Sequence, residues 1–116
     1  MPRTDMTQMY FAKLYPLLIN KAVKKGRTRE EVDQVTTWLT GYSVEDIARL
    51  EQSDTSYGDF FQNAPAMNPN RTLITGKVCG IQVEAIEDPL MREIRYLDKL
   101  VDELAKGKPM AQILRA

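Results

Sequence analysis

The 116-residue chain is 43% hydrophobic and 28% charged, which is typical of a globular domain and excludes a disordered chain. Its net charge is zero, which argues against a global attraction to nucleic acid, and it has no histidine, which excludes nucleophilic pairs that depend on one. The single cysteine allows no disulfide within the chain, and no apolar run is long enough to span a bilayer. The N-terminus lacks a signal-peptide pattern, so we expect one cytoplasmic domain over residues 1–116, without membrane contact.

The first predicted helix begins near Thr4 or Asp5, either of which can cap it, and ends at Gly26. Pro16 falls inside the helical pattern and removes a backbone donor, so we expect a kink or a break near Tyr15. The apolar face is predicted from residues that recur at helical spacing, namely Met6, Met9, Tyr10, Leu14 and Leu17, widened by Phe11 and Leu18.

Two shorter helices follow, each with a clear N-terminal signal. Thr28 and Glu31 form a capping box for the first of them, and Gly41 ends it. Ser43 caps the second. The apolar positions are Val32, Val35, Trp38 and Leu39 in the first helix, and Ile47 and Leu50 in the second.

The helical periodicity fades between residues 52 and 86. The segment Asp59-Phe60-Phe61 fits a single helical turn, and the prolines after Ala64 and Asn68 predict turns. Between Leu73 and Ile86 the apolar residues alternate as in a strand, although their spacing also fits a helix face. The glycines and β-branched residues of this segment favour a short β-hairpin.

The last long helix has the strongest signals: Asp88 caps it, Pro89 takes its first position and Gly107 ends it. Its apolar stripe is Leu90, Ile94, Leu97, Val101 and Leu104, and the pairs Asp88/Arg92 and Asp102/Lys106 support it. A short terminal helix carries Met110, Ile113 and Leu114. The predicted fold is therefore mainly α, a small helical domain with a short β-hairpin before a long C-terminal helix; an α+β class is the alternative.

A set of short segments lies in order over nearly the whole chain. They are Lys25-Gly26-Arg27-Thr28, Trp38-Leu39-Thr40-Gly41-Tyr42, Ala64-Pro65, Met67-Asn68-Pro69-Asn70, Ile74-Thr75-Gly76, Cys79-Gly80, Glu87-Asp88-Pro89-Leu90-Met91 and Ile94 through Lys108. With these segments the chain resembles the bacterial family known as domain of unknown function 2200. The resemblance implies a bacterial cytosolic protein that forms one complete domain, and it implies no activity, ligand or catalytic residue.

The densest run of charge is a basic cluster of Lys21, Lys24, Lys25, Arg27 and Arg29. Cations at this position complement the negative end of a helix, so a solvated helix terminus explains most of the cluster. The alternative is that it binds nucleic acid or another polyanion, which is not the favoured hypothesis. Residues 1–29 have a net charge of +6 and residues 30–59 a net charge of −7, so the two blocks can attract each other within a chain or between chains.

A polar loop of Asn68, Asn70, Arg71 and Thr75 is a candidate small-molecule pocket, although turn geometry explains its asparagines equally well. A third hypothesis is an enzyme without His, for which Arg71, Glu84 and Cys79 are the candidate groups nearest in sequence. We expect these three not to form a catalytic cluster, and we expect Cys79 to be a small buried thiol. No metal site, phosphate loop or cofactor is predicted.

The favoured function is a non-enzymatic interaction module that self-associates or binds another protein. In the last long helix, Met91 and Leu100 extend the apolar surface beyond the main stripe, and Met110, Ile113 and Leu114 add to it. This surface is wider than packing within one chain needs, so it predicts a homodimer. The alternative is a monomer in which the first helix covers the surface.

Overall fold

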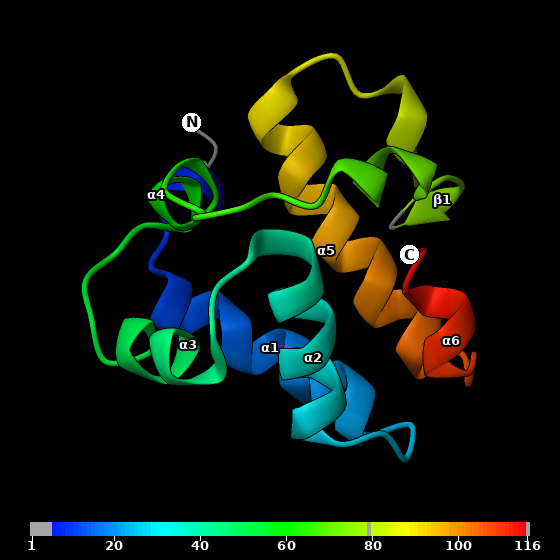
Figure 1. The fold of residues 1–116 in the computed structure, drawn as a ribbon, viewed down its shortest axis with the longest axis horizontal. Helices are drawn as coiled ribbons and strands as arrows, with labels where there is room; N and C mark the ends of the chain where they lie inside the picture. Colours follow the sequence, from blue (N-terminus) through cyan, green and yellow to red (C-terminus); the bar gives the residue numbers. More distant parts are fainter. Residues whose placement is uncertain (1–5, 79, 116) are drawn as a thin grey trace.

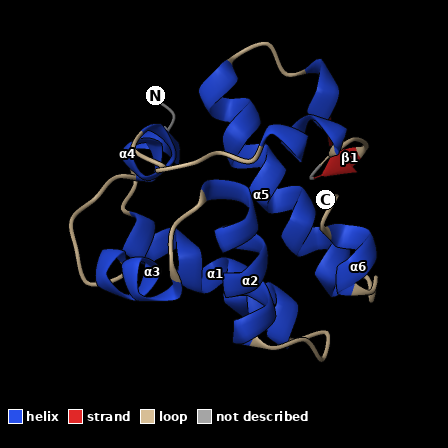
Figure 2. Cartoon of the chain, in the orientation of Figure 1, coloured by secondary structure: helices blue, strands red, loops and turns tan. Residues whose placement is uncertain are grey.

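The structure is a computed structural model, and it describes residues 6–78 and 80–115. The α-helices are α1 (Phe11–Val23), α2 (Arg29–Thr40), α3 (Val44–Leu50), α4 (Tyr57–Gln62), α5 (Pro89–Ala105) and α6 (Met110–Ile113). Short 3-10 helices lie at η1 (Met6–Gln8), η2 (Pro69–Leu73) and η3 (Val83–Ala85), and the strands are β1 (Lys77–Val78) and β2 (Ile81–Gln82). Helices account for most of the described chain (Figure 2). The predicted mainly α class, with a hairpin before a long C-terminal helix, is confirmed.

The core is built around α5, which crosses the middle of the molecule (Figure 1). α5 packs against α1, α2 and α4, and also against α6, β1 and η3. The predicted stripe is confirmed, since Ile94, Leu97, Val101 and Leu104 are fully buried, whereas Leu90 in the first turn is half-buried. An amphipathic helix gains most of its stability by burying such a face, which explains why the clearest sequence pattern forms the centre of the fold.

The helix ends form as their sequence signals predict. The Thr28 hydroxyl accepts a hydrogen bond from the Glu31 amide at 3.2 Å, and the Glu31 carboxylate accepts one from the Thr28 amide at 3.0 Å. Ser43 heads a second capping box, and the Asp88 carboxylate accepts from the first amides of α5. Gly41 ends α2 with φ of 82°, a left-handed conformation that L side chains rarely adopt.

The prediction for the first helix is partly wrong. The proposed caps Thr4 and Asp5 lie outside the described residues, and α1 begins at Phe11, after η1 and a bend. The helix also runs through Pro16 without a break. One missing backbone donor costs a single helical hydrogen bond, and the packing of α1 against α2, α4 and α5 offsets this loss.

The predicted apolar face of α1 is partly wrong: Phe11, Leu14 and Leu18 pack in or against the core as expected, but the centre of the buried face is shifted. Phe11 and Tyr15 are fully buried and stack on each other, and Phe11 also stacks on Phe60 with ring centroids 4.2 Å apart. Tyr10 and Leu17, which were expected inside, are exposed. Aromatic rings bury more area than leucine side chains, so the aromatic face of α1 takes the core side.

A buried polar network joins α1 to α2. The Tyr15 hydroxyl donates to Asp33 Oδ1 at 2.7 Å and lies 3.0 Å from Thr36 Oγ1. Arg29 Nε lies 3.4 Å from Asp33 Oδ2, which partly compensates the buried carboxylate. Burial raises the pKa of the Tyr15 hydroxyl, so this group stays a neutral donor.

The segment after α4 lies along α2 before it forms the hairpin. The Ala66 amide donates to the Thr40 carbonyl oxygen at 3.0 Å, and Asn68 caps η2. β1 and β2 pair antiparallel with Val78 opposite Ile81, which confirms the hairpin. Cys79 lies outside the described residues, so its predicted burial stays a prediction.

The two ion pairs predicted within α5 have different outcomes. The Asp102–Lys106 pair forms, with an N–O distance of 3.0 Å. Arg92 instead donates through Nε to the Ile86 carbonyl oxygen at 2.8 Å, while the Asp88 carboxylate is occupied as the helix cap. The free backbone carbonyl before the helix is therefore the better partner for Arg92.

Candidate functional site

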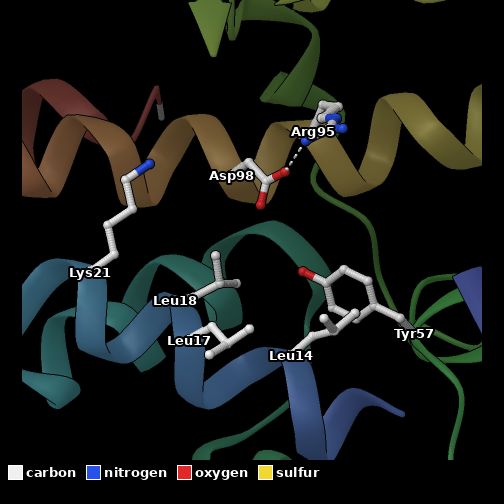
Figure 3. Close-up of a pocket in the computed structure, with 7 residues that line it drawn as sticks. All are labelled: Leu14, Leu17, Leu18, Lys21, Tyr57, Arg95 and Asp98. Carbon is white, nitrogen blue, oxygen red and sulfur yellow. Dashed lines mark hydrogen bonds and ion pairs between the residues drawn. The ribbon is translucent and has the colours of Figure 1, made fainter. Parts of the chain in front are cut away.

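A groove with a volume of about 260 Å³ lies between α1 and α5. α1 forms one wall, α5 the other, and α4 contributes one end; Lys21 and Tyr57 lie at opposite ends of the groove (Figure 3). The lining residues are Leu14, Leu17, Leu18 and Lys21 of α1, Tyr57 of α4, and Arg95 and Asp98 of α5. The site is thus an apolar depression with a few polar groups, which is the usual composition of a binding site.

The apolar wall comes from the outer side of α1. Leu17 is 61% exposed, and Leu14 and Leu18 are half-buried beside it. A single exposed leucine is ordinary, but three leucines that line a hollow form a continuous apolar surface. This surface exists because α1 has apolar residues on two faces: the aromatic face is buried in the core, whereas Leu14 and Leu18 are only partly buried against it and Leu17 is exposed.

Tyr57 supplies a buried polar group at one end of the groove. The residue is only 2% exposed, and its hydroxyl points into the groove (Figure 3). Among the described residues this hydroxyl has no hydrogen-bond partner. Burial raises the pKa of Tyr57 well above its usual value, so the hydroxyl is a neutral donor and acceptor at physiological pH. A hydroxyl that lines a hollow and has no partner within the described chain can form a hydrogen bond to a ligand in that hollow.

Arg95 and Asp98 form an ion pair on the α5 wall, with 2.9 Å between Nη1 and Oδ2. Both side chains are mostly buried, and the Nε of Arg95 is buried without a partner. Burial raises the pKa of Asp98, and the neighbouring Arg95 opposes this rise. The pair adds no net charge to the groove, and the other charged lining residue, Lys21, lies 3.4 Å from Asp102.

A second hollow, with a volume of about 360 Å³, lies at the N-terminal end of α1. It is lined by Gln8, Met9, Tyr10 and Lys13. Tyr10 is the N-cap of α1, and Lys13 of this hollow and Leu17 of the groove are one turn apart on the helix, so the two hollows follow each other along α1. The outer side of α1 is therefore an elongated, hollowed surface.

This surface is basic. α1 and the turn after it contain Lys13, Lys21, Lys24 and Lys25, and residues 6–29 contain no acid. Lys21 lies 3.4 Å from Asp102 of α5, whereas the other three lysines are exposed and form no ion pair within the described part of the chain. We call the groove, the second hollow and these four lysines the α1 surface.

The predicted polyanion cluster is divided by ion pairs within the chain. Arg27 pairs with Glu31 at 2.6 Å and donates to the Lys108 carbonyl oxygen, while Arg29 pairs with Asp33 and Glu51. The hydrogen bond from Arg27 lowers the pKa of Glu31. Lys24 and Lys25 are the members of the cluster that face solvent without an acidic partner among the described residues. The basic residues 1–29 and the acidic residues 30–59 therefore form some of their ion pairs within one chain.

The side chains of the polar loop are partly engaged within the chain. Asn68 donates to the Trp38 carbonyl oxygen at 3.2 Å, and Arg71 pairs with Glu93 at 3.0 Å and donates to the Asn68 carbonyl oxygen. Asn70 and Thr75 are exposed. A neighbouring cavity of about 420 Å³ is lined by Phe61, Gln62, Met67, Asp88, Pro89, Leu90 and Glu93, and by none of these four residues.

Of the three candidate groups for an enzyme, the two that the structure describes have separate surroundings. Arg71 contacts Glu93, whereas Glu84 accepts from the Gly76 amide at 2.9 Å and from Gln82. Cys79 lies outside the described residues. Within residues 6–78 and 80–115, no three metal-ligating side chains gather in one place, and no helix there has the length and apolarity to cross a membrane.

The apolar surface that motivated the homodimer packs within the chain. Leu100 and Ile113 are fully buried, and Met91, Met110 and Leu114 pack against the core from partly buried positions. α6 covers the C-terminal part of α5. The homodimer itself stays a prediction, but this surface no longer requires one.

Tyr57, Arg95 and Asp98 were not expected from the sequence to belong to a site. Each looks like an ordinary core or helix-surface residue until α1, α4 and α5 are brought together. One usable signal was present, because Leu17, Leu18 and Ile19 are consecutive and cannot all lie on one buried face of a helix.

Comparisons with known proteins place the chain among proteins without an assigned activity. The sequence profile of a family described as "Uncharacterized protein conserved in bacteria (DUF2200)" matches residues 5–115. The solved structure "Crystal structure of uncharacterized protein SP1917" is similar, with a TM-score of 0.90 and 54% sequence identity over 94% of this chain and 89% of that chain. The curated proteins contain no match. Neither description mentions a ligand or a partner.

Proposed function

The chain belongs to the DUF2200 family of bacterial proteins, and we propose that it is a non-enzymatic module that binds another protein through the groove between α1 and α5. The observation that carries the proposal is an exposed Leu17 beside two half-buried leucines in a hollow that also contains the unpaired hydroxyl of Tyr57. Interfaces of this kind use apolar anchors around a few hydrogen-bonding groups.

The chemistry of the groove supports binding more than catalysis. Burial raises the pKa of Tyr57, so the phenol stays protonated at neutral pH and cannot accept a proton as a base, and Asp98 is paired with Arg95. Neither group has a neighbouring nucleophile among the groove-lining residues. Leucine side chains on the opposite wall offer contact area, which suits recognition. We also propose a cytoplasmic location, which the single cysteine of the 116 residues supports because it permits no disulfide between them.

The proposal can be tested by site-specific crosslinking in the bacterium. A photoreactive amino acid is placed at Leu17 in the groove or at Leu73, which is 58% exposed but lies outside the groove. We expect a defined partner protein to crosslink at position 17 and not at position 73. That partner is then identified, purified and titrated with the wild-type chain and with Leu17→Glu and Leu73→Glu variants.

The proposal requires that Leu17→Glu weakens binding at least tenfold while Leu73→Glu leaves it unchanged. Both substitutions replace an exposed leucine, so the two variants carry the same added charge and the same small risk to folding. If the two variants bind the purified partner equally, or if position 17 gives no specific crosslink, the groove is not the binding surface.

A further inference from the structure

We infer that the α1 surface binds an acidic amphipathic helix of the partner, with two apolar anchor residues about two turns apart. The inference rests on the proposed function, and it specifies the chemistry of the occupant. The spacing of the hollows, the charge of their surroundings and the unpaired hydroxyl of Tyr57 support it independently.

The spacing of the two hollows favours an elongated occupant. Tyr10 of the second hollow and Leu17 of the groove are seven residues apart, which is about 10 Å along a helix axis. Residues i and i+7 of a partner helix have the same separation and lie on the same face. A partner helix that lies along α1 can therefore place one apolar side chain in each hollow, which is the usual way a helix occupies a groove.

The charge around the hollows favours an acidic occupant. Lys13, Lys24 and Lys25 are exposed without an acidic partner among the described residues, and Lys21 lies at one end of the groove. Lysines of this kind at the edge of an interface accelerate association with an acidic partner and disfavour a basic one. Carboxylates that flank the two anchors on the partner helix would meet these lysines.

The same lysines argue against a second copy of this chain on the surface. In an antiparallel two-fold pairing of α1 helices about Leu17, Lys13 of one copy lies opposite Lys21 of the other, because both are four residues from Leu17. In a parallel two-fold pairing each lysine faces its own equivalent. Both arrangements bring like charges together, and residues 6–29 contain no acid that would compensate them.

Tyr57 distinguishes a polypeptide from a lipid surface. The residue is 2% exposed, and its hydroxyl points into the groove and is unpaired within the described chain. Hydrocarbon chains offer no hydrogen bond, whereas a helix can present Ser, Thr, Asn or Gln beside its apolar anchor. A hollow also accepts a protruding side chain better than it accepts a flat bilayer surface.

A displayed library of helical peptides tests the inference. Anchor positions i and i+7 are randomised among apolar and small residues, and the flanking positions among Glu, Lys, Gln and Ser. The full chain is used for selection, and enriched peptides are titrated by fluorescence anisotropy at two salt concentrations. We expect apolar anchors, Glu at the flanks, a tenfold loss of affinity with Leu17→Glu, and weaker binding at high salt.

A charge reversal provides the decisive comparison. In a Lys13→Glu/Lys24→Glu variant, which breaks no ion pair within the described residues, the preference should switch to peptides with Lys at the flanks. Neutral or basic peptides selected by the wild-type chain, or a preference that survives the charge reversal, would overturn the inference. The inference would also be overturned if selection on the wild-type chain enriched no peptide more strongly than selection on the Leu17→Glu variant.

Two further measurements identify the competing occupants. Light scattering over a range of protein concentrations would show a second copy as a mass increase that Leu17→Glu abolishes. Binding to a lipid surface would appear as cosedimentation of the protein with vesicles of phosphatidylcholine and phosphatidylglycerol, which Leu17→Glu abolishes. Either result overturns the inference. A crosslinked partner that binds the groove without an acidic helix would refute the inference and leave the proposed function standing.

Discussion

Arg115 and Glu103 form a two-point ion pair in which each of two guanidinium nitrogens lies 2.7 Å from a carboxylate oxygen. Glu103 belongs to α5 and its side chain is only 2% exposed, so Arg115 holds the segment after α6 against the centre of the fold. Lys108 adds a second cation at 3.5 Å. The buried carboxylate is therefore compensated mainly by a residue close to the end of the described chain.

The first prediction concerns this pair. Arg115→Ala should lower the free energy of unfolding by about 3 kcal/mol, because it leaves Glu103 buried with only Lys108 nearby. A Glu103→Leu/Arg115→Met double variant should lose less, since no unpaired charge remains. Urea unfolding monitored by circular dichroism measures both, and a double variant that is less stable than the single one would contradict the explanation.

The second prediction compares two leucines. Leu97→Ala should cost about 2–5 kcal/mol because Leu97 is fully buried in α5 and its removal leaves a cavity. Leu17→Ala should change the free energy of unfolding by less than about 0.5 kcal/mol, since Leu17 is largely exposed. Thermal and urea unfolding give both values. A large loss with Leu17→Ala would mean that the α1 surface contributes to folding.

The third prediction uses two glycines with similar backbone conformations. Gly26 and Gly41 have φ of 87° and 82°, so alanine at either position is strained by about 1–2 kcal/mol. A Cβ at Gly41 would also lie 2.9 Å from the backbone nitrogen of Ala66, whereas a Cβ at Gly26 meets no atom within 4 Å. Gly41→Ala should therefore be clearly more destabilising than Gly26→Ala in urea unfolding; equal losses would show that the segment after α4 can move away from α2.

The fourth prediction concerns pH. The hydrogen bond from Arg27 lowers the pKa of Glu31 from its ordinary value of 4.5, so the folded state releases this proton more readily than the unfolded state. The stabilisation is therefore complete above pH 4.5 and is lost as the pH falls through the folded pKa. Glu31→Gln keeps the capping geometry and should cost about 0.5 kcal/mol at pH 7, a difference that shrinks in acid. Urea unfolding of both proteins between pH 7 and acid pH measures this difference. A difference in the free energy of unfolding that does not change with pH would contradict the lowered pKa of Glu31.

The fifth prediction concerns nucleic acid. Since Lys21, Arg27 and Arg29 pair with acids of the same chain, binding to double-stranded DNA should release counterions mainly for Lys24 and Lys25. The logarithm of affinity should then fall with the logarithm of salt concentration with a slope of about −2, instead of about −4.5 for five free cations. Fluorescence anisotropy at several salt concentrations measures the slope. A slope near the larger value, removed by Lys24→Gln/Lys25→Gln, would restore the polyanion hypothesis.

The local features of the fold could be predicted from the sequence. The caps at Thr28, Ser43 and Asp88 and the left-handed end at Gly41 depend on groups within four residues of one another, so neighbouring residue types decide them. The stripe of α5 is also local, because its spacing matches the helical period.

Which face of α1 is buried, and where the candidate site lies, were decided only by the tertiary structure. α1 has an aromatic face and a leucine face, and the choice between them depends on the stacking of Phe11 on Phe60, a partner that local spacing does not reveal. The ion pairs Lys21–Asp102 and Arg29–Glu51 likewise join segments that are far apart in the sequence, and they occupy two cations of the basic cluster. The groove combines side chains of α1, α4 and α5, so its existence follows from packing at a distance along the chain, whereas the helices themselves follow from hydrogen bonds and burial patterns within a few residues.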